Sequence, residues 1–326
     1  MEKINIGDIP GFRIGQAQDL GAATGCTVIL REAGGVCGVD VRGGSPGTRD
    51  TDALSPLANR KLVHGILLAG GSSFGLDAAA GVMEFLEAKN IGREVGLTRL
   101  PNLCAAILFD LACGDHRVRP GPAMGYAACE NAFRGEPFQS GNFGAGTGAT
   151  VGKFRGPAFA MKGGIGAAAW RQGGLLVGAV AAVNCVGDVL EQNRIIAGVR
   201  GDDGRTLIGT EGLILEAYHR PRDFFSGAPL EGTNTVLGCV ITNAKLDKAG
   251  AALLARQGQN GIARAIRPAH SVYDGDTVFA LCSGELSASP DAAGILAAGA
   301  MEGAIIDAVK SARSLGGYPA MGDCSP

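Results

Sequence analysis

The stretch Asn234-Thr235-Val236-Leu237-Gly238-Cys239-Val240-Ile241 is an apolar run with a polar start, and it governs how the whole chain is interpreted. Its valine and isoleucine content predicts a buried β-strand over Val236 to Ile241. The chain reaches it through Tyr218 to Thr233, which is rich in proline, glycine and charge and is typical of a linker or long loop. The pair Asn234-Thr235 therefore stands where a loop ends and a strand begins.

Outward from this strand, six more apolar runs bounded by glycine indicate further strands. They cover residues 27–31, 36–41, 65–68, 105–109, 175–183 and 277–281. Helical patterns lie between them, at Asp77 to Lys89 and at Asp247 to Ile266. A last helix is predicted to begin at Ser289-Pro290-Asp291, with Ser289 as its cap, and to stop at Gly316-Gly317. Strands and helices are mixed throughout, which predicts an α/β or α+β class.

Composition restricts the classes of function. Of the 326 residues, 46% are hydrophobic and 18% are charged, and the formal net charge is −2. A protein that binds nucleic acid by neutralising phosphates would be basic, so nucleic acid is not an expected partner. The sequence shows neither a signal-peptide pattern nor an uninterrupted apolar stretch near membrane-spanning length. We therefore expect a cytoplasmic location and no membrane partner.

Two further patterns bear on cofactors. The nine cysteines are scattered without metal-ligand spacing, so we expect reduced, buried thiols and no metal. Gly144-Ala145-Gly146-Thr147-Gly148-Ala149 matches a dinucleotide-binding fingerprint. However, the segment before it, Glu136 to Asn142, is polar, whereas the fingerprint follows an apolar strand. We expect no nucleotide and no other cofactor.

Gly71-Ser72-Ser73-Phe74-Gly75 fits the nucleophile-elbow pattern of serine hydrolases, between a predicted strand and a predicted helix. His270 could then complete a triad with Ser73. Against this, the chain lacks a His-Gly-Gly-Gly oxyanion segment, and such a short pattern has a high false-positive risk. A glycine-rich turn whose serines cap the helix is favoured, with Ser73 as the alternative nucleophile.

Thr235 also has two interpretations. A threonine at the start of a strand usually reflects β-propensity alone. If the bond before it breaks, however, its own α-amine, with a pKa of about 7.7–8.0, can act as the general base for its hydroxyl. Downstream, Asp274 and Asp276 are two residues apart before an apolar strand, so both carboxylates can line one face of an extended segment. A polar turn that leads into the strand is the alternative there.

Taken in order, the segments resemble the autoprocessing N-terminal-nucleophile aminopeptidases. That family includes the L-aminopeptidase/D-esterases, the β-peptidyl aminopeptidases and the nylon-oligomer endohydrolases. The likeness covers essentially the whole chain, and the ordered set is more specific than any one segment. The matching segments are residues 38–52, 68–77, 144–149, 234–238, 242–244, 261–268, 273–279 and 316–320.

The resemblance implies a four-layer αββα sandwich, a single domain over residues 1–326. It implies self-cleavage between Asn234 and Thr235, which gives chains of residues 1–234 and 235–326. It also implies a homo-oligomer, a tetramer of processed units.

The same resemblance assigns roles to residues. Thr235 would be the nucleophile and Asn184 the oxyanion stabiliser. Asp274 and Asp276 would surround the nucleophile's amine and hydroxyl, and Lys153 would lie near the nucleophile. One departure is Phe109, which stands near the place where some relatives have a catalytic-site tyrosine.

The resulting hypothesis is a self-cleaving N-terminal-threonine hydrolase of small amides or peptides. It would be an aminopeptidase or amidase, and its small-molecule or peptide substrate could include D-, β- or amide-oligomer compounds. One alternative is an N-acetyl transferase of the ornithine/glutamate type, which passes the acyl group to an amine. The others are a serine hydrolase that uses Ser73 and an uncleaved, non-catalytic binding or scaffold protein.

Overall fold

The computed structural model describes residues 1–219 and 234–324. The stretch predicted as a linker therefore lies outside the described residues from position 220 onward. The longer strands are β2 (Arg13–Asp19), β3 (Thr24–Val41), β5 (Val63–Ala69), β8 (Leu103–Ile107), β11 (Gly164–Gln172), β12 (Leu175–Asn184), β15 (Thr235–Ala244) and β17 (Thr277–Leu286). The helices are α1 (Ala78–Ala88), α2 (Pro122–Arg134), α3 (Thr210–Glu216), α4 (Lys248–Ala265) and α5 (Pro290–Ser311).

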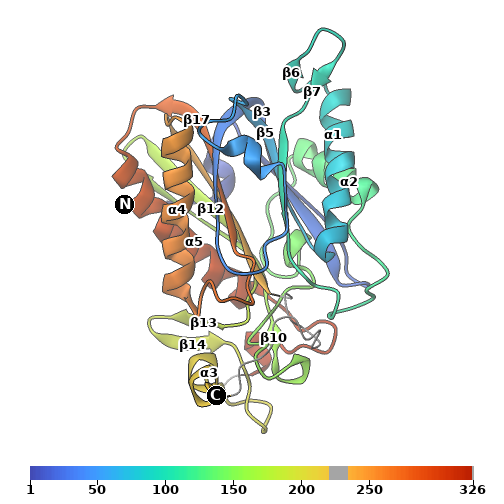
Figure 1. Cartoon of the computed structure of the whole chain (residues 1–326), viewed down its shortest axis with the longest axis vertical. Helices are drawn as coiled ribbons and strands as arrows, with labels where there is room; N and C mark the ends of the chain where they lie inside the picture. Colours follow the sequence, from blue (N-terminus) through green and yellow to red (C-terminus); the bar gives the residue numbers. More distant parts are fainter. Residues whose placement is uncertain (220–233, 325–326) are drawn as a thin grey trace.

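Shorter strands complete the description. They are β1 (Glu2–Ile4), β4 (Thr48–Arg49), β6 (Arg93–Glu94), β7 (Arg99–Leu100), β9 (Thr150–Val151), β10 (Met161–Lys162), β13 (Asp188–Glu191), β14 (Arg194–Ala197) and β16 (Ile266–Arg267). β6 and β7 form a hairpin that projects from one end of the molecule, at the top of Figure 1. β13, β14 and β10 lie at the opposite end (Figure 1).

The long strand β3 joins two sheets. Its first half pairs with β2 and β5, and its second half pairs with β17, with a shift of register between Leu30 and Gly35. The sequence predicted separate strands at 27–31 and 36–41, and these are the two halves of β3. Each half obeys the strand pattern locally, but the residues between them give no sign that the strand continues. One sheet then has the order β1-β11-β12-β15-β17-β3, and the other continues from β3 through β5, β8 and β4.

The predicted four layers are confirmed. α4 and α5 cover the outer face of the first sheet, and α1 and α2 cover the outer face of the second (Figure 1). Three hydrophobic cores fill the spaces between adjacent layers. The middle core joins Ile29 and Leu68 of one sheet to Leu237 and Phe279 of the other.

Both faces of β15 are buried, as its continuous apolar sequence predicts. Val236 and Val240 belong to the core under α4 and α5. The alternate residues Leu237, Cys239 and Ile241 belong to the core between the sheets. Because side chains alternate along a strand, Thr235 belongs to the face that looks between the two sheets.

Helix α5 is long and apolar enough to cross a membrane by length and composition. Yet 61% of its most apolar window is buried, and it packs on β11 and β12. Among the described residues it is the single helix with this property, and its burial is that of a core helix. Its start is as predicted, with Pro290 in the first turn, but Ser289 makes no side-chain capping bond.

One close contact sets the spacing between α4 and its sheet. A Cβ atom on Gly38 of β3 would stand 2.2 Å from the backbone nitrogen of Ala252 in α4. Backbone atoms cannot move aside as a flexible side chain can, so only glycine allows the helix to lie this close to the strand.

We expect Gly38→Ala to lower the free energy of unfolding by about 1–3 kcal/mol or more, because the methyl group pushes α4 off β3. Urea denaturation followed by circular dichroism measures the loss. Gly212→Ala is the matched control, since a Cβ there meets nothing within 4 Å and Gly212 lies in α3. The control should be neutral or slightly stabilised, and equal behaviour of the two variants would contradict the packing argument.

Candidate active site

The register of β12 and β15 brings together two of the predicted site residues. In this antiparallel pair Asn184 stands directly opposite Thr235. Residues opposite one another across a ladder point to the same face, so both side chains face the space between the sheets. Asn184 is fully buried and Thr235 is 3% exposed. They lie where β12 ends and β15 begins, at the end of the molecule that carries β13 (Figure 1).

Hydrogen bonds fix the orientation of the Asn184 amide. Its Oδ1 accepts the backbone N–H of Thr150 at 2.9 Å, so its Nδ2 is directed the other way. Nδ2 donates to the carbonyl oxygen of Phe109 at 3.0 Å, across the gap to the end of β8. The amide nitrogen is therefore held on the same side of the sheet as Thr235, with its orientation set before any ligand arrives.

Lys153 contacts the backbone of Asn184. Its Nζ donates to the backbone carbonyl of Asn184 at 2.9 Å. Burial lowers the pKa of Lys153 to about 7, although Cys185 and Asp274 act in the opposite direction. A lysine in this state can exist either charged or neutral near neutral pH, which is a property of groups that move protons.

Asp276 and Asp274 lie beside the start of β15, and of these two only the Asp276 carboxylate contacts that strand. Asp276 Oδ1 accepts the backbone N–H of Val236 at 2.7 Å. Asp274 forms a parallel bridge with Asn234, and its Oδ1 accepts the N–H of Val186 at 3.2 Å. Burial, followed by the neighbouring Asp276 carboxylate, raises the pKa of Asp274 to about 7. Asp274 is therefore a carboxyl group that can hold a proton near neutral pH.

The carbonyl oxygen of the bond before Thr235 accepts two hydrogen bonds. The Thr235 hydroxyl donates to the carbonyl oxygen of Asn234. The same oxygen accepts the backbone N–H of Gly275 at 2.9 Å. A Cβ atom on Gly275 would lie 2.2 Å from the carbonyl oxygen of Ser45, so glycine is required for this approach.

The structure thus brings Thr235, Asn184, Lys153, Asp274 and Asp276 to one place, while their catalytic roles remain predictions. Sequence reasoning did not find several partners at this place. These are the Phe109 carbonyl, the backbone N–H groups of Thr150 and Gly275, and the side chains of Ser271 and His270 at the carboxylates. Backbone groups leave no trace in sequence, but the two carboxylates that closely follow His270 were a usable signal.

The alternative triad is not formed. His270, the residue that would serve Ser73, has its ring Nδ1 2.7 Å from Asp276 Oδ2 instead. Ser73 is exposed. The residues with left-handed backbone in this turn are Gly71 and Ser72, whereas a nucleophile elbow places its nucleophile at the strained position. The serines do not cap the helix as the favoured interpretation expected, since Asp77 is the residue before α1 and no side-chain cap is made there.

A small cavity adjoins Asn184's partners. Its lining includes Phe109, Thr150, Lys153, Pro157 and Tyr318. Phe109, the departure from the family pattern, thus contributes to the lining of this cavity and gives its carbonyl to Asn184. Its volume is about 10 Å³, which is room for about one water molecule, and its described lining does not include Thr235.

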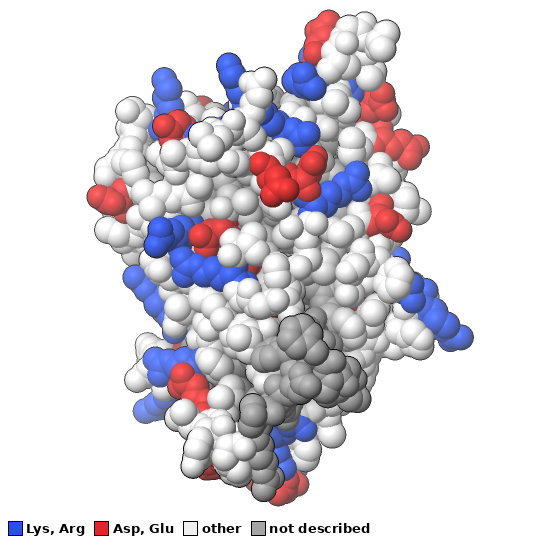
Figure 2. Space-filling model, viewed as in Figure 1, with Lys and Arg blue, Asp and Glu red and all other residues white. Residues whose placement is uncertain are grey.

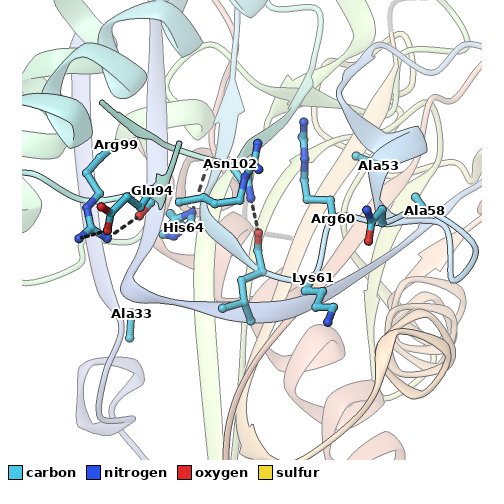
Figure 3. A pocket seen from close by; sticks show the side chains of 13 residues that line it. Ala33, Ala53, Ala58, Arg60, Lys61, His64, Glu94, Arg99 and Asn102 are labelled. Carbon is cyan, nitrogen blue, oxygen red and sulfur yellow. Dashed lines mark hydrogen bonds and ion pairs between the residues drawn. The ribbon is translucent and has the colours of Figure 1, made fainter. Parts of the chain in front are cut away.

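A second cavity, of about 720 Å³, lies near the β6–β7 hairpin at the other end of the sheets (Figure 3). Arg99 faces Glu94 at 3.1 Å there, and Arg60 pairs with Asp50 at 2.6 Å. Its described lining has no serine, threonine or cysteine. Because Arg60 and Arg99 are paired and the described lining lacks a hydroxyl or thiol nucleophile, we do not place the site there.

No group of three or more His, Cys, Asp or Glu side chains that could hold a metal ion occurs among residues 1–219 and 234–324. All nine cysteines are buried and free. On the face drawn in Figure 2, acidic and basic side chains of the described residues are interspersed, without an extended patch of one sign. The absence of a cofactor and of a nucleic-acid partner stays a prediction.

Comparison with known proteins gives a consistent result. Residues 5–321 match peptidase family S58. An uncharacterised aminopeptidase of Mycobacterium leprae (strain TN) is 37% identical, over 97% of this chain and 92% of its own. The 6-aminohexanoate-oligomer endohydrolase of Paenarthrobacter ureafaciens is 31% identical, over 93% of this chain and 85% of its own.

Solved structures share the fold. The β-aminopeptidase of a Burkholderia species superposes with a TM-score of 0.66 at 22% identity, over 98% of this chain and 91% of its own. The L-aminopeptidase D-Ala-esterase/amidase of Ochrobactrum anthropi, described as a variant of the Ntn hydrolase fold, superposes with a TM-score of 0.69 at 19% identity. This match covers 97% of this chain and 88% of its own.

The raised pKa of Asp274 predicts a pH dependence of stability. A carboxyl whose pKa is higher in the folded than in the unfolded protein loses its favourable contribution as pH rises from about 4 to about 7. Asparagine mimics the protonated acid, so Asp274→Asn should match the wild type near pH 4 and be more stable at about pH 7.5, by an amount on the order of a few kcal/mol. Urea unfolding at both pH values tests this, and a constant difference would refute it.

Proposed function

Because the chain belongs to peptidase family S58 and is a hydrolase, we propose that it acts on small amides or peptides through Thr235, after cutting its own chain before that residue. The observation that carries the proposal is the position of Thr235. Its side chain stands opposite Asn184, and its hydroxyl contacts the carbonyl of Asn234.

Self-cleavage would use the groups already on this bond. The Thr235 oxygen attacks the Asn234 carbonyl carbon, and the negative charge that develops on the carbonyl oxygen is met by the Gly275 N–H. The C–N bond then breaks and the hydroxyl proton passes to the departing nitrogen, which leaves an ester on the threonine oxygen and a free α-amine. Water hydrolyses the ester, so the products are a carboxylate on Asn234 and an N-terminal Thr235.

Turnover would repeat this acyl transfer on a substrate. The α-amine of Thr235 takes the hydroxyl proton as the oxygen attacks a substrate carbonyl. Asn184 Nδ2 is oriented to donate to the developing oxyanion, because Thr150 holds the other end of its amide. Asp276 lies one peptide unit from the amine and stabilises the ammonium form that appears as the amine takes the proton. The substrate C–N bond then breaks, the α-ammonium passes its proton to the departing amine, and water hydrolyses the acyl ester on the Thr235 oxygen.

The names of the relatives suggest the substrate class. One is called an aminopeptidase and another a 6-aminohexanoate-oligomer endohydrolase. Peptides and these oligomers share a secondary amide between short, flexible chains. We propose this class of substrate for the present chain, and we keep assembly into a homo-oligomer and a cytoplasmic location as predictions.

Processing gives the first test of this proposal. We expect the purified protein to run as two bands of about 24 and 9 kDa, for residues 1–234 and 235–326 of the 32.9 kDa chain, with the small band starting Thr-Val-Leu-Gly. Thr235→Ala should stay at full length and be inactive, whereas Thr235→Ser should still process. Ser73→Ala is the control and should process and turn over normally. An active Thr235→Ala beside an inactive Ser73→Ala would reverse the assignment.

The role of Asn184 can be separated from its packing. Asn184→Asp keeps an oxygen for the Thr150 N–H but has no N–H to donate to an oxyanion. We expect kcat to fall by about 100-fold or more in both Asn184→Asp and Asn184→Ala. Rates are to be expressed per processed chain, with melting curves to confirm folding. Near-normal kcat in the folded, processed Asn184→Asp protein would show that the amide nitrogen is not the oxyanion donor.

A further inference from the structure

We propose that His270 is a positioning residue for the Thr235 reaction, because it holds the Asp276 carboxylate against the reactive end of β15. The inference rests on the proposed function. Neither the resemblance nor the residue pattern assigns His270 this place, because the pattern points to Ser73 as its partner.

The contacts form a clamp on one carboxylate. His270 reaches Asp276 Oδ2 twice, from its ring Nδ1 at 2.7 Å and from its backbone N–H at 3.2 Å. The other oxygen, Oδ1, accepts the N–H of Val236 at 2.7 Å. Asp276 has a side chain only 2% exposed. One oxygen of Asp276 therefore binds His270, and the other binds the residue after Thr235.

The chemistry of the ring fixes its orientation. An ionised carboxylate can only accept hydrogen bonds, so Nδ1 must carry the proton in that state. The other nitrogen, Nε2, is buried and has no hydrogen-bond partner within the described part of the chain. A buried polar atom without a partner is unfavourable. The ring is thus placed for its contact with Asp276 and not for a fully satisfied environment.

The backbone of His270 is also in an unfavourable conformation. Its φ is +55°, in the left-handed region that residues with a Cβ rarely adopt. Strain of this kind persists where the surroundings impose it, and it is frequent at active sites. The left-handed turn lets both the backbone N–H and the ring of His270 reach the same oxygen.

The neighbouring carboxylate has a parallel arrangement that sharpens the assignment. Asp274 Oδ2 accepts from the backbone N–H of Ser271 at 3.1 Å and from its hydroxyl. His270 and Ser271 thus each hold one of the two aspartates. Of the two, only Asp276 also contacts β15, through its other oxygen. The loss of the His270 ring should therefore disturb the position of Thr235 as well as remove packing.

The test uses three variants of the full chain. Asparagine and glutamine place an amide nitrogen at different distances from the backbone. The amide nitrogen introduced by His270→Asn overlays Nδ1, whereas the one introduced by His270→Gln overlays Nε2. We expect His270→Ala to lower kcat by at least about tenfold per processed chain, with KM changed less than about twofold. His270→Asn should restore most of kcat, and His270→Gln should not.

His64→Ala is the matched control. His64 is buried, and its Nδ1 also takes part in a hydrogen bond, with the backbone N–H of Asn102 at 3.2 Å. It lines the cavity near the β6–β7 hairpin and not the Thr235 site (Figure 3). It should lose stability without a loss of kcat. Wild-type kcat in a folded His270→Ala protein, or equal rescue by asparagine and glutamine, would overturn the inference. If Thr235→Ala is inactive while His270→Ala is normal, only the role of His270 fails, whereas an active Thr235→Ala protein refutes the proposed function itself.

Discussion

The pairing of β12 with β15 is the constraint on which the site depends. Both faces of β15 are buried, so a slip of one residue would exchange the side chains in the inter-sheet core with those under the helices. Such a slip would also turn Thr235 toward α4 and α5 and away from Asn184. The stability of two hydrophobic cores thereby fixes the direction in which one hydroxyl points. The scaffold therefore sets which way Thr235 faces, and the hydrogen bonds within the site orient the groups around it.

A second buried lysine, Lys162, is held by backbone carbonyls. Lys162 is fully buried, and its ammonium donates to the carbonyls of Gly146, Ala149 and Gly163. Burial lowers the pKa of Lys162 to about 8. The glycine-rich stretch at 144–149 thus gives backbone carbonyls to a buried lysine. The same loop leads to Thr150, whose N–H orients Asn184.

The sequence allowed the layer order, most core strands and the main site residues to be predicted, because periodicity and the ordered resemblance carry that information. It did not reveal that β3 runs through both sheets, since its two apolar halves look like separate strands. Nor did it reveal the Phe109 carbonyl or the Gly275 N–H, because every residue has such groups and only the fold aims them. His270 was noticed for its chemistry but assigned to Ser73, because chain order does not show which partner is near.

The central position of β15 and β17 has a consequence for how the molecule comes apart. These strands, with α4 and α5, belong to the part of the chain after Asn234, yet they are flanked by β12 and β3 from the part before it. After a cut before Thr235, the two chains remain packed together, because β15 pairs with β12 and β17 with β3, and because α4 and α5 pack on strands of the first chain. Unfolding of the intact chain is unimolecular in both directions, but refolding of the cut chain requires two molecules to meet. The cut form should then refold at a rate that depends on protein concentration. The lifetime of its folded state would therefore be set by its unfolding rate.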